Sequence, residues 1–333
     1  MHVWPSIKRF FLRLFRREAR PGRFEPCAKF ALDGWLAAAP LIWPRRDGLV
    51  YVPKGWSRWR RAPLLVLCHG CRQTPEEFAQ GARIAAWADA GRWLVLLPRQ
   101  KDEANPWRCW NWFDARTVDG HGEAAIVAAQ IESIAGRYRA DARRVVVAGM
   151  SAGGALAAVL GLRDAGRVRA VIVHSGLACG AAASAVTALG VMKFGPETDI
   201  LALARAARLE APPEALPVPL LAIHGAEDDI VAPRNAVALV CQYLAFNGHA
   251  VASALVSDTV LPEPDDEART TTGDGHAIVT RDWRTGGRLV VRYISVGGLA
   301  HAWSGGDSTL PYNDATAPAA TGLIDAFVHD AGL

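Results

Sequence analysis

The sequence contains no apolar run of the roughly eighteen residues that a membrane-spanning helix needs. It contains no internal repeat and no large excess of one charge: the formal net charge is +4, and most of the excess lies in the first sixty residues and in scattered arginines. This mild balance gives no reason to expect a nucleic-acid partner. The 333 residues, about half of them hydrophobic, are enough to bury a sizeable core in one domain.

Cysteine is also scarce for a disulfide-built fold, since only six occur in 333 residues. There is no paired C-x-x-C pattern, so a zinc site is not expected, and no other metal or organic cofactor is predicted. Cys68 is expected to pack in the core, as buried free cysteines commonly do. The six are Cys27, Cys68, Cys71, Cys109, Cys179 and Cys241.

A clear secretion signal is missing as well. Residues 7–17, IKRFFLRLFRR, place apolar side chains at helical spacing with basic ones between them, but Arg13 interrupts the apolar run and no convincing cleavage site follows. We expect residues 1–45 to form a basic amphipathic arm and linker, with residues 1–20 contacting a membrane or granule surface; the alternative is an arm folded back on its own domain. This favours a cytoplasmic or granule- or membrane-associated protein, with secretion as the alternative.

What the sequence does contain is a regular alternation of apolar, β-branched runs with helical patterns. Strands are predicted over 63–70, 92–100, 143–150, 168–176 and 218–225, and the runs 276–283 and 288–298 flank the turn RTGG as a hairpin or as adjacent strands. Helices are predicted over 75–90, 122–139, 234–247 and 317–331 and directly after Ser151, and 261–275 is expected to be a loop. Continuous apolar strands between helices indicate an α/β fold, a mostly parallel sheet covered on both faces. Residues 46–333 are expected to form this single domain.

The motif GMSAG, residues 149–153, stands where a predicted strand meets a predicted helix. It fits the nucleophile elbow G-x-S-x-G, in which small residues let the chain turn sharply and hold the serine hydroxyl above the sheet. The N–H of Ala152, at a helix N-terminus, then points towards a developing oxyanion. Glycine and serine also begin ordinary helices, so the motif alone leaves that alternative open.

Two further segments supply partners for such a serine in the order serine, acid, histidine. The strand 218–225 runs into a loop with Glu227, Asp228 and Asp229, and His301 follows the strand 288–298. Serine needs a base, and the imidazole needs a carboxylate to fix its tautomer. A lone loop histidine is commonly structural, whereas three such residues in this order predict a catalytic triad. His174 and His224 are expected to be structural.

The segments HGCRQ, NPWRCWNWF, VVVAGMSAGG, HGAEDDIVAP and HAWSGG together resemble the polyhydroxybutyrate depolymerase-like esterases, which are related to the feruloyl and acetyl-xylan esterases of carbohydrate esterase family 1. The similarity runs from about residue 49 to the C-terminus. The sequence differs in having Ala300 where the family typically has glycine before the histidine. It also has a basic arm in place of a secretion signal, and no separate polymer-binding domain is seen. The resemblance implies an α/β-hydrolase fold and serine hydrolysis of carboxylic esters through an acyl-enzyme.

The resemblance also implies roles for individual residues. Ser151 is the nucleophile and His301 the base, and the family pattern puts the acid four residues after the histidine of HG, at Asp228. His69-Gly70-Cys71 resembles the HG-x element of esterases, which makes the N–H of Cys71 the second oxyanion donor and leaves His69 structural. Family members often carry both Cys71 and Cys109, so a disulfide between them is one possibility and two free thiols the other.

Substrate-binding residues are harder to predict. Tryptophans such as Trp110, Trp112 and Trp303 either pack under loops or line an apolar cleft, and they are our candidates for binding substrate. We expect a polyhydroxyalkanoate, other polyester or oligoester substrate. Feruloyl or acetyl-xylan esters and poly(aspartic acid) are the alternatives, and a granule-surface binding protein is the non-enzymatic one; the complete triad argues against the last.

Overall fold

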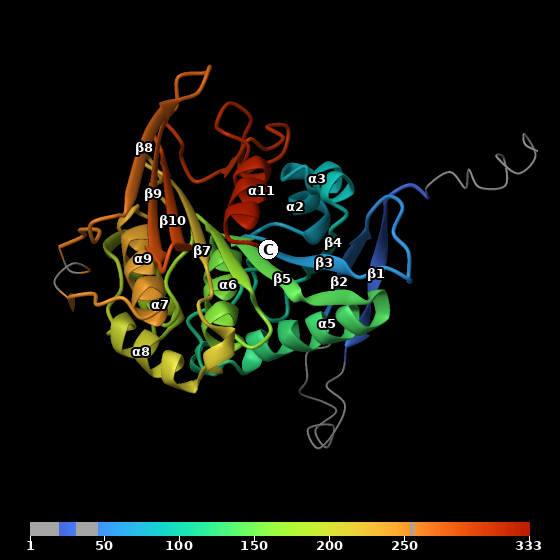
Figure 1. Ribbon diagram of the computed structural model, residues 1–333, viewed down its shortest axis with the longest axis horizontal. Helices are drawn as coiled ribbons and strands as arrows, with labels where there is room; N and C mark the ends of the chain where they lie inside the picture. The colour runs from blue at the N-terminus through green and yellow to red at the C-terminus, as the bar shows by residue number, and fades with distance from the viewer. Residues whose placement is uncertain (1–19, 31–45, 254–255, 257) are drawn as a thin grey trace, which may run out of the picture.

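One ten-stranded sheet organises the molecule, as a computed structural model shows for residues 20–30, 46–253, 256 and 258–333 (Figure 1). Six neighbouring strands are parallel and form the centre of the sheet, and antiparallel strands extend it at both ends. From one edge to the other the strands are β1 (Arg23–Phe30), β2 (Arg46–Val52), β4 (Leu94–Pro98), β3 (Ala62–Cys68), β5 (Ala140–Met150), β6 (Ala170–His174), β7 (Leu220–Gly225), β10 (Arg288–Val296), β9 (Ala277–Thr285) and β8 (Asp266–Thr271).

Helices cover both faces of this sheet. On one face lie α5 (Gly122–Tyr138), α6 (Ala152–Arg163), α7 (Ala185–Phe194), α8 (Ile200–Glu210) and α9 (Arg234–Phe246). On the other lie α2 (Pro75–Gly81), α3 (Ile84–Gly91) and α11 (Ala320–Asp330). Short elements complete the chain: α4 (Ala115–Val118), the 3-10 turn η2 (Pro213–Ala215) and the two-residue strands β11 (Trp303–Ser304) and β12 (Asn313–Asp314).

The central strands are apolar throughout because both their faces are buried. Along β3, Leu64 and Val66 pack with the helices of one face, whereas Leu65 and Leu67 pack with those of the other. Alternating side chains of a strand point to opposite faces, so a strand between two helical layers has no polar side. This explains why these strands could be predicted from continuous apolar runs.

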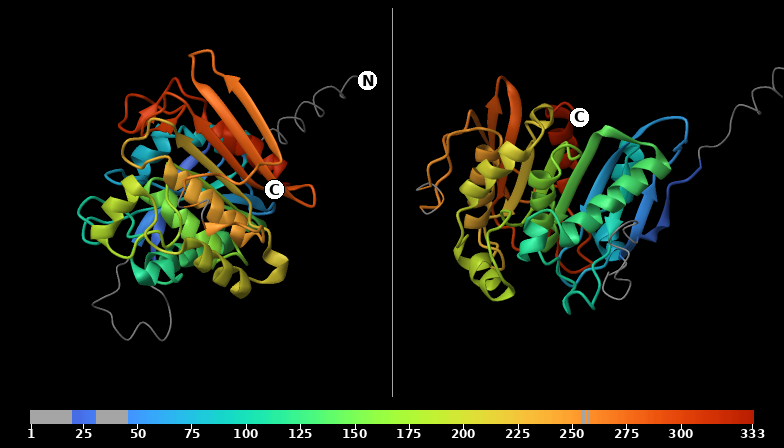
Figure 2. Two further views of the ribbon diagram at one scale, coloured as in Figure 1. Left: turned by 90° about the vertical axis from the view of Figure 1, so that its left-hand side faces the viewer. Right: turned by 90° about the horizontal axis from the view of Figure 1, so that it is seen from below.

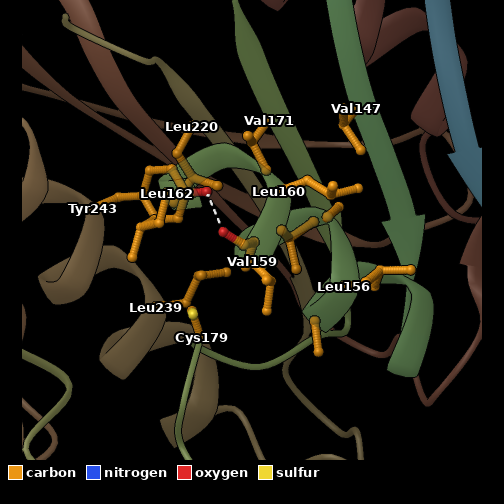
Figure 3. Packing of buried hydrophobic residues seen from close by; sticks show 14 of the residues in the cluster. Val147, Leu156, Val159, Leu160, Leu162, Val171, Cys179, Leu220, Leu239 and Tyr243 are labelled. Carbon is orange, nitrogen blue, oxygen red and sulfur yellow. Dashed lines mark hydrogen bonds between the residues drawn. The ribbon is translucent and has the colours of Figure 1, made fainter. Parts of the chain in front are cut away.

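Helix α6 is buried all round and fixes the position of the residue before it. Figure 3 shows Leu156, Val159, Leu160 and Leu162 of α6 packed against the sheet and neighbouring helices, with the Tyr243 hydroxyl donating to Ala158 O at 2.9 Å. A helix held by packing on every side cannot shift without opening cavities in the core. Ser151, at the N-cap of α6, is therefore held on a rigid element.

The predicted parallel sheet and its main helices are confirmed, and 276–283 and 288–298 lie in a hairpin, since β9 and β10 pair antiparallel. Two expectations about local structure are wrong, and some elements were not predicted. The helix predicted over 75–90 is two helices, α2 and α3, because Arg83 adopts a positive φ of 53° between them. Helices α7 and α8 were not predicted. The expected loop 261–275 contains β8, an edge strand with every residue exposed, so it lacks the apolar face that signals a strand.

The expected domain boundary at residue 45 also needs correction. Residues 23–30 form β1, which pairs with β2 at the edge of the same sheet, opposite the edge formed by β8 (Figures 1 and 2). Residues 1–19, with the basic amphipathic segment, and 31–45 lie outside the described residues. No helix in the described part of the chain is long and apolar enough to cross a membrane.

Candidate active site

Ser151 occupies a sharp turn between β5 and α6, at the carboxyl end of the parallel sheet. Its backbone is held at φ 56° and ψ −124°, a conformation unusual for a residue with a side chain, and its N–H donates to His174 O at 2.9 Å. Within the described residues its hydroxyl makes no hydrogen bond. The strained turn therefore leaves the Ser151 oxygen available at the end of the strand, as a nucleophile elbow requires.

The glycines around Ser151 are needed because backbone segments approach very closely there. A Cβ on Gly153 would lie 2.2 Å from Cys68 O at the end of β3, and a Cβ on Gly149 would lie 2.3 Å from Gly153 O. No side chain fits at such distances. The motif glycines thus let α6 begin directly against the ends of β3 and β5.

Asp228 and His301 meet beside this turn, although 73 residues separate them. His301 Nδ1 donates to Asp228 Oδ2 at 2.7 Å, while Asp228 Oδ1 accepts the N–H groups of Ile230 at 3.1 Å and Val231 at 2.8 Å. With the proton on Nδ1, the other imidazole nitrogen is an acceptor. The pair has the geometry that orients a histidine base.

The charge of Asp228 is stabilised by its partners. Burial alone would raise its pKa, but the hydrogen bond to His301, the charge of that imidazole when protonated and the Val231 N–H together lower it below its ordinary value. Its neighbours differ: Glu227 and Asp229 are exposed, and the Glu227 carboxylate accepts Gly298 N at 3.1 Å. Of the three acids in the loop, the structure turns Asp228 towards His301.

The loop after β3 approaches Ser151 from the neighbouring strand. Gly70 N donates to Gln73 Oε1 at 2.9 Å, and Arg72, at φ 63°, donates its N–H to Trp107 O at 2.7 Å. These contacts fix the backbone on both sides of Cys71. No acceptor among the described residues takes the N–H of Cys71 or of Ala152, so both remain available as hydrogen-bond donors.

A disulfide joins this loop to the tryptophan-rich loop. Cys71 and Cys109 are bonded at an S–S distance of 2.07 Å, and Gln100 Nε2 donates to Cys109 O at 2.9 Å. The other four cysteines are buried and free. Of the two alternatives for Cys71 and Cys109, the structure contains the bridge.

Ser151 and His301 line one cleft of about 420 Å³. Its walls are mostly apolar, and several of the large side chains around it are exposed: Trp107 is 60% exposed and Leu189 65%. They come from segments far apart in the sequence, so the cleft is a product of the tertiary fold. The lining residues are Gly70, Cys71, Arg72, Gln73, Trp107, Cys109, Met150, Ser151, Leu189, Met192, Ile230, His301 and Tyr312.

A family model described as esterase PHB depolymerase matches residues 48–258, well over half of the chain. The chain belongs to this family. Poly(3-hydroxyalkanoate) depolymerase C of Paucimonas lemoignei is 29% identical over 202 residues, 60% of this chain and 48% of that protein. Feruloyl esterase B of Neurospora crassa is 28% identical over 141 residues, 41% of this chain and 47% of that protein.

This PHB depolymerase-family chain thus spans about half the length of the curated relatives it matches. The structure of an acetyl xylan esterase from Aspergillus awamori resembles it with a TM-score of 0.66, at 17% identity, over 84% of this chain and 94% of that one. At this identity the likeness concerns the fold alone. The fold is that of the α/β-hydrolases, as the sequence predicts.

The three tryptophans chosen as substrate-binding candidates do not line the cleft of this family member, and that expectation is corrected. Trp110 is buried because its indole N–H donates to His69 O at 3.1 Å, which places the ring under the loop after β3. Trp112 packs against Phe113, and Trp303 stacks on His174. Trp107, from the same aromatic run, lines the cleft instead.

The other buried histidines near the site have structural roles. His69 donates through Nδ1 to Gly70 O and accepts Gln100 N at Nε2, and burial lowers its pKa to about 4. His174 accepts Ser304 N, and burial lowers its pKa to about 3. His224 donates to Val231 O at 2.7 Å; burial lowers its pKa too. All three stay neutral at neutral pH, which suits scaffolding better than proton transfer.

Sequence reasoning missed most of the cleft walls. Leu189 and Met192 lie on α7, which was not predicted, and Tyr312 lies in a segment without a motif. Ile230 is exposed beside the cleft, whereas the next residue, Val231, is buried in the core. The one available signal was Trp107, whose place in the aromatic run next to Cys109 indicated a loop near the site.

Proposed function

We propose that this protein hydrolyses carboxylic esters through an acyl-enzyme, with Ser151 as nucleophile, His301 as general base and Asp228 as the residue that orients His301. The observation that carries the proposal is the 2.7 Å hydrogen bond from His301 to buried Asp228 beside an elbow serine in the same cleft. Family membership supports the same chemistry.

The residues have defined tasks in this mechanism. Ser151 Oγ attacks the ester carbonyl while His301 Nε2 takes its proton, and the imidazolium is stabilised by Asp228. The tetrahedral oxyanion accepts the N–H groups of Ala152 and Cys71. His301 then protonates the leaving alcohol, and water, activated in the same way, releases the acid. Ser151 and His301 are not yet hydrogen-bonded here, as is common before substrate binds.

The substrate we propose is an aliphatic polyester or oligoester of the hydroxyalkanoate type. Support comes from the apolar cleft and from similarity to a protein named as a poly(3-hydroxyalkanoate) depolymerase. A feruloyl or acetyl-xylan ester is the second candidate, because other relatives are named as esterases of those kinds. Hydroxybutyrate oligomers, feruloyl esters and acetylated xylan compared side by side will rank these substrates; poly(aspartate) tests the remaining alternative.

Replacing Ser151 by alanine tests the reaction itself. The variant removes one oxygen, so we expect a normally folded protein whose kcat on a soluble p-nitrophenyl ester falls by several orders of magnitude. A fluorophosphonate probe should label the unmodified protein at Ser151 and leave the variant unlabelled. Activity above about a tenth of the original would refute Ser151 as nucleophile, and an unmodified protein that does not label would favour a binding protein.

A further inference from the structure

Within the described part of the chain, the cleft contains one permanent charge, and it is unpaired. Among the described residues that line it, Arg72 alone carries a fixed charge, and no aspartate or glutamate is present. The Arg72 side chain is exposed and makes no ion pair or hydrogen bond within the described part of the chain. Two arginines elsewhere in the chain are paired, by contrast: Arg99 contacts Asp47 at 3.1 Å, and Arg108 contacts Asp102 at 3.1 Å.

The backbone that carries Arg72 is fixed more firmly than that of an ordinary surface arginine. The preceding residue is bonded to Cys109, and the Arg72 N–H donates to Trp107 O at 2.7 Å. The following residue, Gln73, is buried and accepts Gly70 N. The guanidinium therefore extends from a rigid point on the rim, next to the proposed oxyanion donor Cys71.

We propose that Arg72 binds a carboxylate carried by the substrate, so that the preferred substrate is an ester with a free acid group a few bonds from the scissile carbonyl. This rests on the proposed ester hydrolysis. A guanidinium presents a planar pair of donors that matches a carboxylate, and the surrounding apolar walls offer no competing acid. Arg72 directly follows Cys71 and lines the same cleft as Ser151, so a carboxylate held by Arg72 lies in the cleft where the ester is cleaved.

The chemistry of hydroxyacid polyesters supplies such substrates. Each hydrolysis of an internal ester leaves one fragment that ends in a carboxylate, and the terminal unit of that fragment carries the acid on the alcohol side of its ester bond. Arg72 thus favours acid-terminated oligoesters over neutral esters of the same shape. The acid could equally be on the acyl side, as in a half-ester of a dicarboxylic acid, and the two sources are separable by experiment.

Two matched substrate pairs test this inference. The first compares the free acid of the 3-hydroxybutyrate dimer with its primary carboxamide; the second compares mono-p-nitrophenyl adipate with p-nitrophenyl hexanoate. The measured quantity is the ratio of kcat/KM for the acid to kcat/KM for the neutral partner. The acid lies on the alcohol side of the ester in the first pair and on the acyl side in the second. Arg72→Gln should lower the ratio about tenfold in the pair whose acid reaches Arg72, because a charged hydrogen-bonded contact is lost.

Arg92 provides the matched control. It is exposed, also has a positive φ, of 57°, and lies before β4, at the opposite end of the strands from the cleft. Arg92→Gln should leave the ratio unchanged. Raising NaCl from about 0.05 M to 1 M should lower the ratio of the unmodified protein and scarcely alter that of Arg72→Gln, because salt screens an exposed charge. A purely structural role for Arg72 predicts no such salt dependence.

The outcomes separate the two proposals. Ratios within twofold of the original in both pairs, for Arg72→Gln and also for Arg72→Glu, would overturn the inference while Ser151-dependent hydrolysis stands. Hydrolysis of both pairs that survives Ser151→Ala would overturn the proposed function itself. If Arg72→Gln proves unstable, Arg72→Lys, which keeps the charge and loses the planar pair of donors, should give an intermediate ratio.

Discussion

The three consecutive acids of the loop after β7 show how strongly the position of a single carboxylate matters. Asp228 is buried against His301, whereas Glu227 and Asp229 are exposed on either side of it. We expect Asp228→Asn to reduce kcat by three to four orders of magnitude, because the amide fixes the wrong tautomer of the histidine. Glu227→Gln and Asp229→Asn, measured in the same ester assay, should cost less than about threefold. An equal loss at either neighbour would contradict the assignment.

The buried neutral histidines predict a loss of stability at mildly acidic pH. The folded protein keeps His69 and His174 unprotonated down to about pH 4 and about pH 3, whereas the unfolded chain protonates them near pH 6.5. The unfolded state therefore binds more protons between these values. The free energy of unfolding should fall as pH decreases from about 6.5 to 5, with a slope that approaches about 1.4 kcal/mol per pH unit for each such histidine.

Urea unfolding at several pH values measures this dependence. His69→Gln should reduce the pH dependence of the free energy of unfolding by the contribution of one histidine. His121→Gln, at an exposed position, should leave this pH dependence unchanged. Equal stability at pH 5 and pH 7 would contradict the burial of these imidazoles as neutral groups.

At the residue scale, the sequence predicted those candidate site residues that a short local motif or a position after a strand can indicate. Ser151 could be proposed because an elbow needs small residues at fixed spacing, and His301 and the three loop acids because they follow strands of the same parallel sheet. The choice of Asp228 among those acids came from the family resemblance. Trp110 and Trp303 could not be assigned, since whether a tryptophan faces a cleft or the core depends on partners such as His69 and His174 that lie far away in the sequence.

At the scale of elements, the contact between α6 and β3 depends on a missing side chain. A methyl group on Gly153 would overlap Cys68 O, so Gly153→Ala must push α6 away from the sheet. We expect it to lower the free energy of unfolding by several kcal/mol and to reduce ester hydrolysis with it. Gly136, exposed in the last turn of α5 with open space around it, is the control. Gly136→Ala should stabilise the protein by about 0.5–1 kcal/mol.

Thermal and urea unfolding of both variants check this expectation. A Gly153→Ala protein as stable as the original would show that the close approach at the elbow is not required.

The two outermost strands of the sheet were among the elements that the sequence did not reveal. The central strands have two apolar faces and are visible as continuous runs, whereas β8 is exposed along its whole length and β1 mixes charged and apolar residues. Such strands form because the adjacent strand of the sheet provides backbone hydrogen-bond partners. Backbone pairing of this kind does not require a particular pattern of amino acids, so the sequence of the strand gives little sign of it. Position in the sheet, more than propensity, decided which strands could be predicted.

At the scale of the whole molecule, the N-terminal strand should matter for stability. Cys27 of β1 is buried, and the Tyr138 hydroxyl donates to Glu25, so β1 closes an edge that would otherwise expose β2. A chain that starts at Arg20 should keep the thermal midpoint of the full chain. A chain that starts at Arg46 should lose roughly 5–10 °C and self-associate through the open edge.

Calorimetry and size-exclusion chromatography compare the three lengths. A chain starting at Arg46 that is monomeric and as stable as the full chain would contradict a structural role for β1. The same two shortened chains, mixed with anionic vesicles, would show whether the basic segment of residues 1–19 contributes surface binding.

The order of strands in the sheet also has a consequence for the making of the protein. Strands β3, β5, β6 and β7 can pair once residue 225 has been synthesised, and the elbow at Ser151 can form with them. The base comes much later, since His301 follows β10, which must first align beside β7. Because chains are made from the N-terminus, a ribosome-bound intermediate presents a shaped but unactivated serine. Hydrolytic capacity is therefore acquired only in the closing stage of synthesis, when a C-terminal strand completes a sheet that is already largely assembled.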